Sequence, residues 1–270
     1  MKIYVLTENT LYDESFECEN GLSLYIETKK HNILVDTGTS DVFLQNAEKL
    51  GIDLSKVDIC VLTHGHNDHS GGLIKFFEMN KTAKVYANVD VFGKFYMGEN
   101  EFVGLSDKLK KYKDRFIFVD DEYFIDESLE LFSGNDKKVI SQIKACGYTA
   151  KSNSNFVDDD FHHEHYLIIN EKNGKKALIS GCSHKGINNI MHWVRYDNID
   201  AYIGGIYLLN LDVDNNKDKR SLDMIIDDLL AHKNTNYYVG HCVGEEQYNC
   251  MKQKMGERLN YIRTGQIIEL

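Results

Sequence analysis

The sequence contains no proline and only one tryptophan among its 270 residues. Without proline, its turns must be made by glycine, asparagine and aspartate, which are frequent in this chain. It also lacks any apolar stretch long enough to span a bilayer, so we expect no membrane partner. The first apolar run, at residues 2–7, is too short for a secretory signal and predicts a β-strand instead.

Positive charge is scarce as well, and this deficit narrows the choice of partners. The chain has 31 lysines and arginines against 42 aspartates and glutamates, which gives a formal net charge of −11. Such a balance argues against nucleic acid, and we expect a small-molecule partner instead. Six cysteines without an export signal indicate reduced thiols and predict a cytoplasmic protein.

Histidine, in contrast, is concentrated in one short stretch. Residues 63–72 read Thr-His-Gly-His-Asn-Asp-His-Ser-Gly-Gly, which places His64, His66, Asp68 and His69 within six consecutive positions. Histidines two residues apart cannot share a helix face, but at the end of an extended strand they point the same way. Imidazole suits zinc or iron, and a carboxylate adds a hard oxygen ligand. We therefore predict that this loop binds metal.

The surroundings of this loop fit a site at the end of a strand. Residues 57–62 form a short apolar run typical of a buried strand, and residues 73–77 look like the start of a helix. Strand-to-helix junctions are where α/β folds usually place their chemistry. The His-x-His-x-Asp-His pattern closely resembles the signature of the metallo-β-lactamase superfamily of metal-dependent hydrolases. This resemblance implies that Asp36, in an Asp-Thr-Gly turn after another strand, orients the metal loop.

Strand and helix patterns run through the chain twice, which favours two sheets packed on each other with helices outside. The resemblance implies the same α/β architecture, an αββα four-layer sandwich with two mixed β-sheets. We expect one domain over residues 1–270, with halves at about 1–133 and 161–270 joined by a polar loop. Asn173-Gly174 predicts a hairpin in the second half, and residues 90–113 look helical in pieces.

The second half must complete the coordination, because zinc takes four ligands, or three and a water. His184 and His241 each follow a predicted strand, and we expect both to be ligands. Three more histidines follow a run of aspartates in the polar loop, where such residues are usually solvated; they are His162, His163 and His165.

Cys182 marks a departure from the superfamily. The usual pattern ends this strand with Gly-Asp, and the aspartate bridges two metals, whereas this chain has Gly181-Cys182. A thiolate binds soft metals but bridges hard ions poorly. Ligation and a role as a small buried residue therefore both remain open for Cys182.

Several further motifs resemble one subgroup, the dihydropterin-ribofuranosylaminobenzene 5′-phosphate synthase-like metal-dependent hydrolases. These motifs are Asn9, residues 19–23 (Glu-Asn-Gly-Leu-Ser), residues 181–186 (Gly-Cys-Ser-His-Lys-Gly), Gly204-Gly205 and residues 240–242 (Gly-His-Cys). The chain departs from the subgroup at Asn20 and at Tyr207, where histidine is usual. We consider Tyr207 and Lys185 for substrate binding, Lys185 through an anionic group, with a solvated lysine as the alternative.

The resemblance favours hydrolysis of an ester, lactone or phosphoester in a small molecule by a metal-activated water. One ion would be held by His64, His66 and His184, and a second position by Asp68, His69 and His241. Asp68 would also be catalytic, orienting the water or taking its proton. Zinc is the expected metal, as one or two ions, with manganese or iron as alternatives.

Two other functions remain open. In a transferase, an arylamine would attack a pterin hydroxymethyl diphosphate in place of water. This hypothesis predicts an aromatic pocket with Phe102, Phe156, Trp193 and Tyr207 as candidate walls. A non-catalytic metal or redox sensor would hold the ion without turnover. The sequence identifies neither the physiological substrate nor the oligomeric state.

Overall fold

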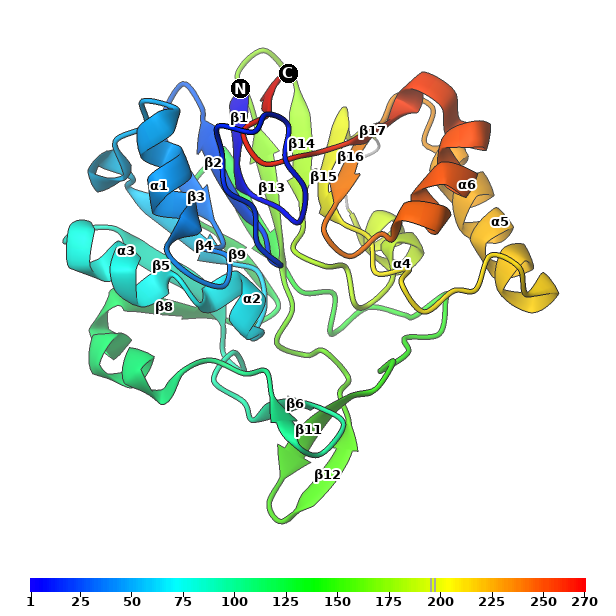
Figure 1. The fold of residues 1–270 in the computed structure, drawn as a ribbon, viewed down its shortest axis with the longest axis horizontal. Coiled ribbons are helices and arrows are strands. Elements are labelled where there is room, and N and C mark those ends of the chain that lie inside the picture. The colour runs from blue at the N-terminus through cyan, green and yellow to red at the C-terminus, as the bar shows by residue number, and fades with distance from the viewer. Residues whose placement is uncertain (195, 197) are drawn as a thin grey trace.

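Two seven-stranded mixed sheets pack face to face, and helices cover their outer faces (Figure 1). The computed structural model describes residues 1–194, 196 and 198–270. The first sheet has the order β18-β1-β2-β3-β4-β5-β8, and the second has the order β17-β16-β15-β14-β13-β10-β9. The predicted αββα sandwich is therefore confirmed.

The elements have the following bounds. The first sheet comprises β1 (Lys2–Thr7), β2 (Ser23–Glu27), β3 (Asn32–Val35), β4 (Ile59–Leu62), β5 (Lys84–Asn88), β8 (Phe116–Val119) and β18 (Ile267–Glu269). The second comprises β9 (Glu122–Phe124), β10 (Leu129–Phe132), β13 (Tyr166–Asn170), β14 (Lys176–Ile179), β15 (Ala201–Gly205), β16 (Asn236–Gly240) and β17 (Leu259–Tyr261). The helices are α1 (Val42–Lys49), α2 (Asn67–Ser70), α3 (Leu73–Met79), α4 (Ile187–Trp193), α5 (Asn216–Ala231) and α6 (Glu245–Met255), with 3-10 turns η1 (Leu54–Lys56), η2 (Asp107–Arg115) and η3 (Gly256–Arg258).

Strand β4 illustrates how the four layers are held together. Because side chains alternate along a strand, Val61 faces the core between the two sheets, while Cys60 and Leu62 face the helices outside. Both faces of this parallel strand are covered, which explains why its sequence is uninterruptedly apolar. In the second sheet, Leu178 and Tyr202 pack in the cluster that also holds residues of α4, α5 and α6.

The strand directions bring several loops to one edge of the sandwich. β3, β4 and β5 are parallel neighbours in the first sheet, and β14, β15 and β16 are parallel neighbours in the second. The carboxyl ends of the strands in each set therefore lie together, which is where open α/β sheets place their ligands. The chain termini lie at the opposite end, where the Met1 amino group donates to the Leu270 carbonyl at 3.1 Å (Figure 1).

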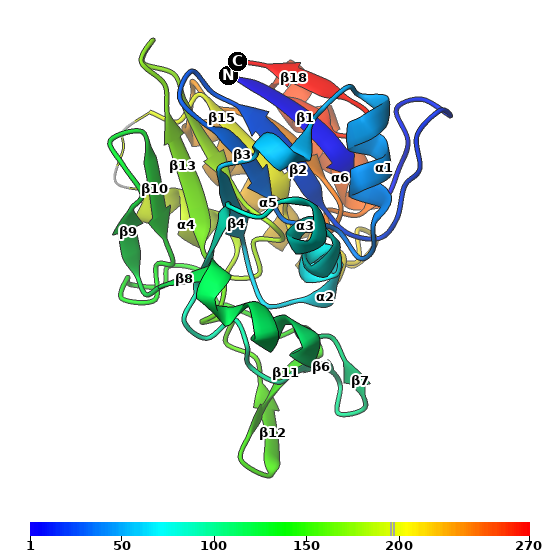
Figure 2. The ribbon, with the colours of Figure 1, turned by 90° about the vertical axis from the view of Figure 1, so that its left-hand side faces the viewer.

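A third sheet of four short strands was not predicted from the sequence. It has the order β12-β11-β6-β7 and comprises β6 (Phe95–Met97), β7 (Glu101–Phe102), β11 (Tyr148–Ser152) and β12 (Asn155–Asp158). It projects below the sandwich in both views (Figures 1 and 2). The helical prediction for residues 90–113 is thus wrong for most of its length, and the predicted polar loop at 134–160 contains the β11–β12 hairpin.

The halves of the chain exchange strands between the sheets. β9 and β10 lie before residue 133 but join the second sheet, and β18 at the C-terminus joins the first. The hairpin predicted at Asn173-Gly174 is confirmed, because β13 and β14 pair antiparallel and Gly174 has a φ of 87°. Among the described residues, none of the helices combines the length and apolar character needed to cross a membrane.

Candidate metal centre

The loop after β4 gathers its histidines in the protein interior. His66 is extended, with φ −97° and ψ 151°, and α2 begins directly after it. The rings of His64 and His66 are both buried, and their centroids lie 4.6 Å apart. Neither Nε2 atom has a hydrogen-bond partner among the residues that the structure describes. Buried polar atoms are nearly always paired, so these two nitrogens need an explanation.

His184 reaches the same point from the second half of the chain. It lies in the connection between β14 and α4, and its ring centroid is 5.1 Å from that of His64 and 4.9 Å from that of His66. One ligand nitrogen from each of the three rings lies within 4.8 Å of the others. Both ring nitrogens of His184 also lack a partner within the described part of the chain. The three rings therefore converge with open nitrogens.

A second group of ligand atoms lies beside the first. The Nε2 atoms of His69 and His241 are 3.2 Å apart, and an Asp68 carboxylate oxygen is 3.3 Å from the latter. The Cys182 sulfur lies 3.2 Å from His69 Nε2 and forms a further candidate group with His64 and His69. All seven residues predicted as ligands from the sequence are thus brought together.

Asp36 fixes the orientation of the metal loop. Its carboxylate accepts hydrogen bonds from the Thr63 amide at 2.8 Å and the Thr63 hydroxyl at 2.7 Å, and it contacts His69 Nδ1 at 2.7 Å. The Thr63 hydroxyl in turn lies 3.0 Å from His64 Nδ1. Because these contacts occupy Nδ1 of His64 and of His69, both rings turn Nε2 toward the centre of the site. Histidines that bind metals usually have such a hydrogen bond at the other ring nitrogen.

His241 is held in a comparable way by the first loop of the chain. Its Nδ1 lies 2.8 Å from the Asn9 side-chain oxygen, and its backbone amide donates to Glu8 at 2.6 Å. Asn9 belongs to the motifs that the sequence offered, but Glu8 did not stand out. Glu8 is fully buried, and only the fold reveals that this carboxylate supports the site.

The backbone around the site is conformationally unusual. Six non-glycine residues in the described chain have positive φ, and four of them belong to this region: Asp36 (57°), Phe161 (57°), Ser183 (60°) and His241 (55°). Such conformations are costly for residues with a Cβ atom, and they cluster at functional sites. The fold therefore places these side chains by accepting local strain.

The electrostatics of the cluster formed by His64, His66 and His184 favour a bound cation. Burial lowers the pKa of His66 to about 3 and that of His64 and His184 well below the ordinary value, which keeps these imidazoles neutral. Neutral imidazole is the form that ligates metals. Although burial would raise it, neighbouring His69 and His241 hold the pKa of the Asp68 carboxyl well below its usual range. Burial opposes the charge on His241, but the hydrogen bond to Asp68 raises its pKa to about 9.

These residues fit a metal ion. Buried neutral imidazoles with unpaired nitrogens cost free energy unless something occupies their lone pairs. A hydrogen-bond donor would serve one of them, but a cation serves all of them together with the Asp68 carboxylate and the Cys182 sulfur. The clusters therefore form a candidate metal-binding site.

Aromatic rings surround the histidines on the side of the third sheet. Tyr148, the first residue of β11, stacks on His66 with centroids 4.6 Å apart and planes inclined by 13°. Phe161 stacks on His184 at 4.4 Å and 7°. The ring centroid of Tyr207 lies 4.7 Å from that of His184 and 5.9 Å from that of Tyr148. The structure thus places this residue, considered for substrate binding, beside the site. Tyr148 and Phe161 were missed because the sequence around them shows neither a strand nor a helix period.

Other candidate substrate residues lie elsewhere. Lys185 is buried, and its ammonium donates to the Ser133 carbonyl, the Asn135 side chain and the Glu164 carbonyl at 3.0, 2.6 and 3.0 Å. All three of its donors are thereby used, which leaves none for a substrate anion and excludes the solvated alternative as well.

The aromatic walls proposed for a ring-binding pocket are also dispersed. Phe102 and Phe156 pack around Tyr96 on the third sheet, with centroid distances of 5.4 and 5.1 Å. Trp193 is buried in the core beside the second sheet and donates to the Lys138 carbonyl. Of the four predicted walls, Tyr207 alone contacts a histidine of the site in the described structure.

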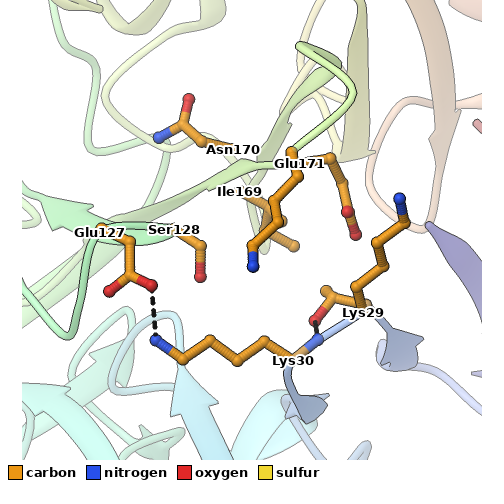
Figure 3. Close-up of a pocket in the computed structure, with 9 residues that line it drawn as sticks. Lys29, Lys30, Glu127, Ser128, Ile169, Asn170 and Glu171 are labelled. Carbon is orange, nitrogen blue, oxygen red and sulfur yellow. Dashed lines mark hydrogen bonds and ion pairs between the residues drawn. The ribbon is translucent and has the colours of Figure 1, made fainter.

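A separate pocket of about 210 Å³ lies at the other end of the sandwich (Figure 3). It is bordered by the turns after β2, before β10 and after β13, and its lining includes Lys29, Lys30, Glu127 and Glu171. The strand directions place these turns away from the metal centre. The pocket is therefore not part of the candidate site.

Comparisons with known proteins agree with this geometry. The family model of the metallo-beta-lactamase superfamily matches residues 17–135. A protein of Methanocaldococcus jannaschii, 7,8-dihydropterin-6-methyl-4-(beta-D-ribofuranosyl)-aminobenzene-5′-phosphate synthase, is 28% identical over 293 aligned residues that cover 100% of this chain and 96% of that protein. The resemblance predicted from the motifs is thereby confirmed.

Solved structures extend the comparison to the fold. A metal-dependent hydrolase of the β-lactamase superfamily superimposes with a TM-score of 0.86 at 26% identity, covering 100% of this chain and 99% of that one. The short form of human tRNase Z superimposes with a TM-score of 0.57 at 14% identity, covering 100% and 99%. The latter likeness concerns the fold alone.

Proposed function

We propose that this protein, which belongs to the metallo-β-lactamase superfamily, is a metal-dependent hydrolase of an ester, lactone or phosphoester bond in a small molecule. The proposal depends above all on one observation. Three buried imidazoles from distant parts of the chain, His64, His66 and His184, converge with ring nitrogens that have no partner in the described structure. Such a constellation is costly without a cation and is typical of hydrolytic metal sites.

The donor atoms divide into two groups. His64, His66 and His184 would hold one ion, and a second position would be formed by Asp68, His69, His241 and Cys182. We propose zinc, because imidazole and thiolate both suit it, with manganese or iron as alternatives. When bound, such an ion makes a water molecule acidic near neutral pH and polarises the oxygen of the bond under attack.

The chain supplies the remaining chemistry. Asp68 stays ionised and is the most accessible carboxylate of the site, with a side chain 20% exposed, so it can orient the attacking water or accept its proton. The rings of Tyr148 and Tyr207 flank the histidines and can hold an apolar part of the substrate while excluding bulk water. Asp36 keeps the loop in place through Thr63 and His69.

The proposed setting follows from composition and thiol state. The net charge of −11 disfavours nucleic acid, and a small molecule fits a site enclosed by side chains. The six cysteines are all free, including the exposed Cys18. Free thiols of this kind suit a reducing compartment, and we propose the cytoplasm.

Substitution of ligands tests the hydrolase proposal. We expect His66→Ala and Asp68→Asn to lower kcat/KM on generic phosphodiesters, esters or lactones by more than about 100-fold, since each removes a ligand or the base. His162→Ala is the matched control, because His162 is exposed and pairs with Asp160. Turnover by wild type that survives in both site variants would contradict the proposal.

A transferase is the second candidate, and the aromatic rings around the site favour it. Tyr148, Phe161 and Tyr207 lie next to the ligand histidines, as a site for a planar ring would require. A relative covering the whole chain is named as a synthase. Turnover in ¹⁸O-labelled water separates the two functions, because hydrolysis puts the label into a product and transfer to an arylamine does not.

A further inference from the structure

The segment 159–165, between β12 and β13, lies beside the metal centre but contains none of the ligands described above. It reads Asp-Asp-Phe-His-His-Glu-His and was expected to be a solvated loop. That prediction is wrong for most of it: Asp160 and His162 are exposed, but the other five residues are buried. The segment therefore packs inside the protein and must serve the residues that surround it.

His163 contacts the metal loop between two of its ligands. The amide of Gly65 donates to His163 Nδ1 at 2.9 Å, and His163 Nε2 lies 3.2 Å from a carboxylate oxygen of Asp159. Because Nδ1 accepts a hydrogen bond, the ring proton must be on Nε2, from which it is donated to Asp159. Both nitrogens of His163 are thereby used, so this ring has none left for a metal. Its role differs from that of His64 and His66.

The position of Gly65 makes this contact important. It is the single residue between the two ligands, and its surroundings are tight: a Cβ at this position would lie 2.6 Å from the Phe95 ring and 2.8 Å from the Val91 carbonyl. The same Phe95 ring packs on His163 with centroids 3.9 Å apart. The backbone that joins His64 to His66 is thus held by packing on one side and by one hydrogen bond to His163.

The same segment also holds the ligand from the second half. A Glu164 carboxylate accepts hydrogen bonds from the amides of His184 and Lys185 at 2.9 and 3.1 Å. The His165 amide donates to the Thr63 carbonyl at 2.8 Å, just before the first ligand. One short segment therefore fixes the backbone on both sides of the three-histidine cluster.

We propose that Asp159 and His163 are positioning residues that set the geometry of His64 and His66 through the amide of Gly65. The proposal rests on the metal centre proposed above. The Asp159 carboxylate holds His163 in one tautomer and one orientation, and His163 holds the loop. Partners of this kind, one contact removed from the metal, typically change metal affinity by about 10- to 100-fold when they are lost.

The test compares two replacements of His163. Leucine has a similar volume but makes neither hydrogen bond, whereas glutamine can accept from the Gly65 amide and donate to Asp159. Zinc dissociation constants would be measured by competition with a chromophoric chelator, and the cobalt-substituted proteins would be compared by their visible spectra. We expect His163→Leu to weaken zinc binding by about 10- to 100-fold and to alter the cobalt spectrum, and His163→Gln to restore both.

Controls separate positioning from folding. His162→Leu changes the exposed neighbour and should bind zinc like the wild type. The melting temperature of each metal-free variant is measured as well, because His163→Leu leaves the buried Asp159 carboxylate and the Gly65 amide without this partner and should lower it. Zinc affinities are then compared at a temperature where every variant is folded. Asp159→Ala, which removes the acceptor and keeps the ring, provides the same test should His163→Leu not fold.

Two results would overturn the proposal: wild-type affinity and spectrum in His163→Leu, or a glutamine variant as weak as the leucine variant. If the proposed metal centre itself were wrong, the wild type and His162→Leu would bind no zinc either. That outcome would overturn both proposals and is distinguishable from failure of the positioning role alone.

Discussion

The two ends of the sandwich hold their histidine side chains in opposite ways. At the end away from the metal centre, His31 lies in the turn after β2. Its ring is held between two carboxylates, with Nδ1 2.9 Å from Asp58 and Nε2 2.7 Å from Asp126. At the other end, His64, His66 and His184 have unpaired nitrogens in the described structure. The His31 side chain is 14% exposed. It joins the first sheet to the second.

The pKa shifts express the same difference. Burial acts to lower the pKa of His31, but its hydrogen bonds to Asp58 and Asp126 outweigh burial and raise it. In the metal centre, burial lowers the pKa of His66 to about 3. Its Nε2 makes no hydrogen bond in the described structure, and an Asp159 carboxylate oxygen lies 4.0 Å away. One end is thus built to hold an imidazolium as a cross-link, and the other is built to keep imidazoles neutral and open. The hydrogen-bonding state of the ring nitrogens separates the two roles.

The largest expected effect is on zinc affinity, and it comes from replacing the carboxylate that holds a histidine at the metal centre but not the one at the other end. Asp36→Asn removes the charge that orients His69 and Thr63 and should raise the dissociation constant for zinc by about 10- to 100-fold. Asp126→Asn, at the other end, should leave zinc affinity unchanged. Calorimetric titration of both variants measures this. Equal affinities would show that Asp36 does not orient the site.

A smaller effect is expected from Cys182. Cys182→Ser replaces a soft sulfur with oxygen, and we expect it to weaken zinc binding about tenfold relative to manganese binding. Cys18→Ser is the control, because Cys18 is exposed and outside the site. Competition between the two metals measures the ratio. An unchanged ratio would indicate that Cys182 is a small buried residue and no ligand.

The smallest effect is expected at the far end and depends on pH. The folded-state pKa of His31 lies above the unfolded value of about 6.5, so its charge stabilises the fold fully below that pH, and this contribution is lost as pH rises through the folded value. His31→Gln should therefore lower the free energy of unfolding by about 1 kcal/mol at pH 6 and by less at pH 9. Metal affinity should not change.

The matched control for His31 is its neighbour. Lys30 pairs with Asp126 at 2.7 Å and is 42% exposed, and lysine does not titrate in this range. Urea unfolding of Lys30→Gln should give the same small loss at pH 6 and pH 9. A loss for His31→Gln that is equally independent of pH would contradict the imidazolium cross-link.

The ligands could be found from sequence because each sits in a short pattern at a strand end. One loop carries four of them within six positions, namely His64, His66, Asp68 and His69. The strand before it, β4, is recognisable from its apolar run. His184 follows a strand whose hairpin partner is marked by Asn-Gly. Parallel strands then bring these ends together, and that step follows from the fold class alone.

The supporting residues could not be found in this way because their roles depend on long-range packing. Asp159 and His163 look like a polar loop until the segment is placed beneath Gly65, 98 residues earlier in the chain. The third sheet pairs Tyr148 with Met97, 51 residues earlier, and β6 has only three residues, too few to show a period. Lys185 resembled a substrate contact, but Glu164, Ser133 and Asn135 surround it only in the fold.

The most direct test is a crystal structure of the zinc-loaded protein with anomalous scattering measured at the zinc edge. The account predicts a strong peak enclosed by the rings of His64, His66 and His184, with His31 unchanged between its two carboxylates. Zinc only on surface groups such as His162 and Asp160, with the three rings left without an ion between them, would contradict it.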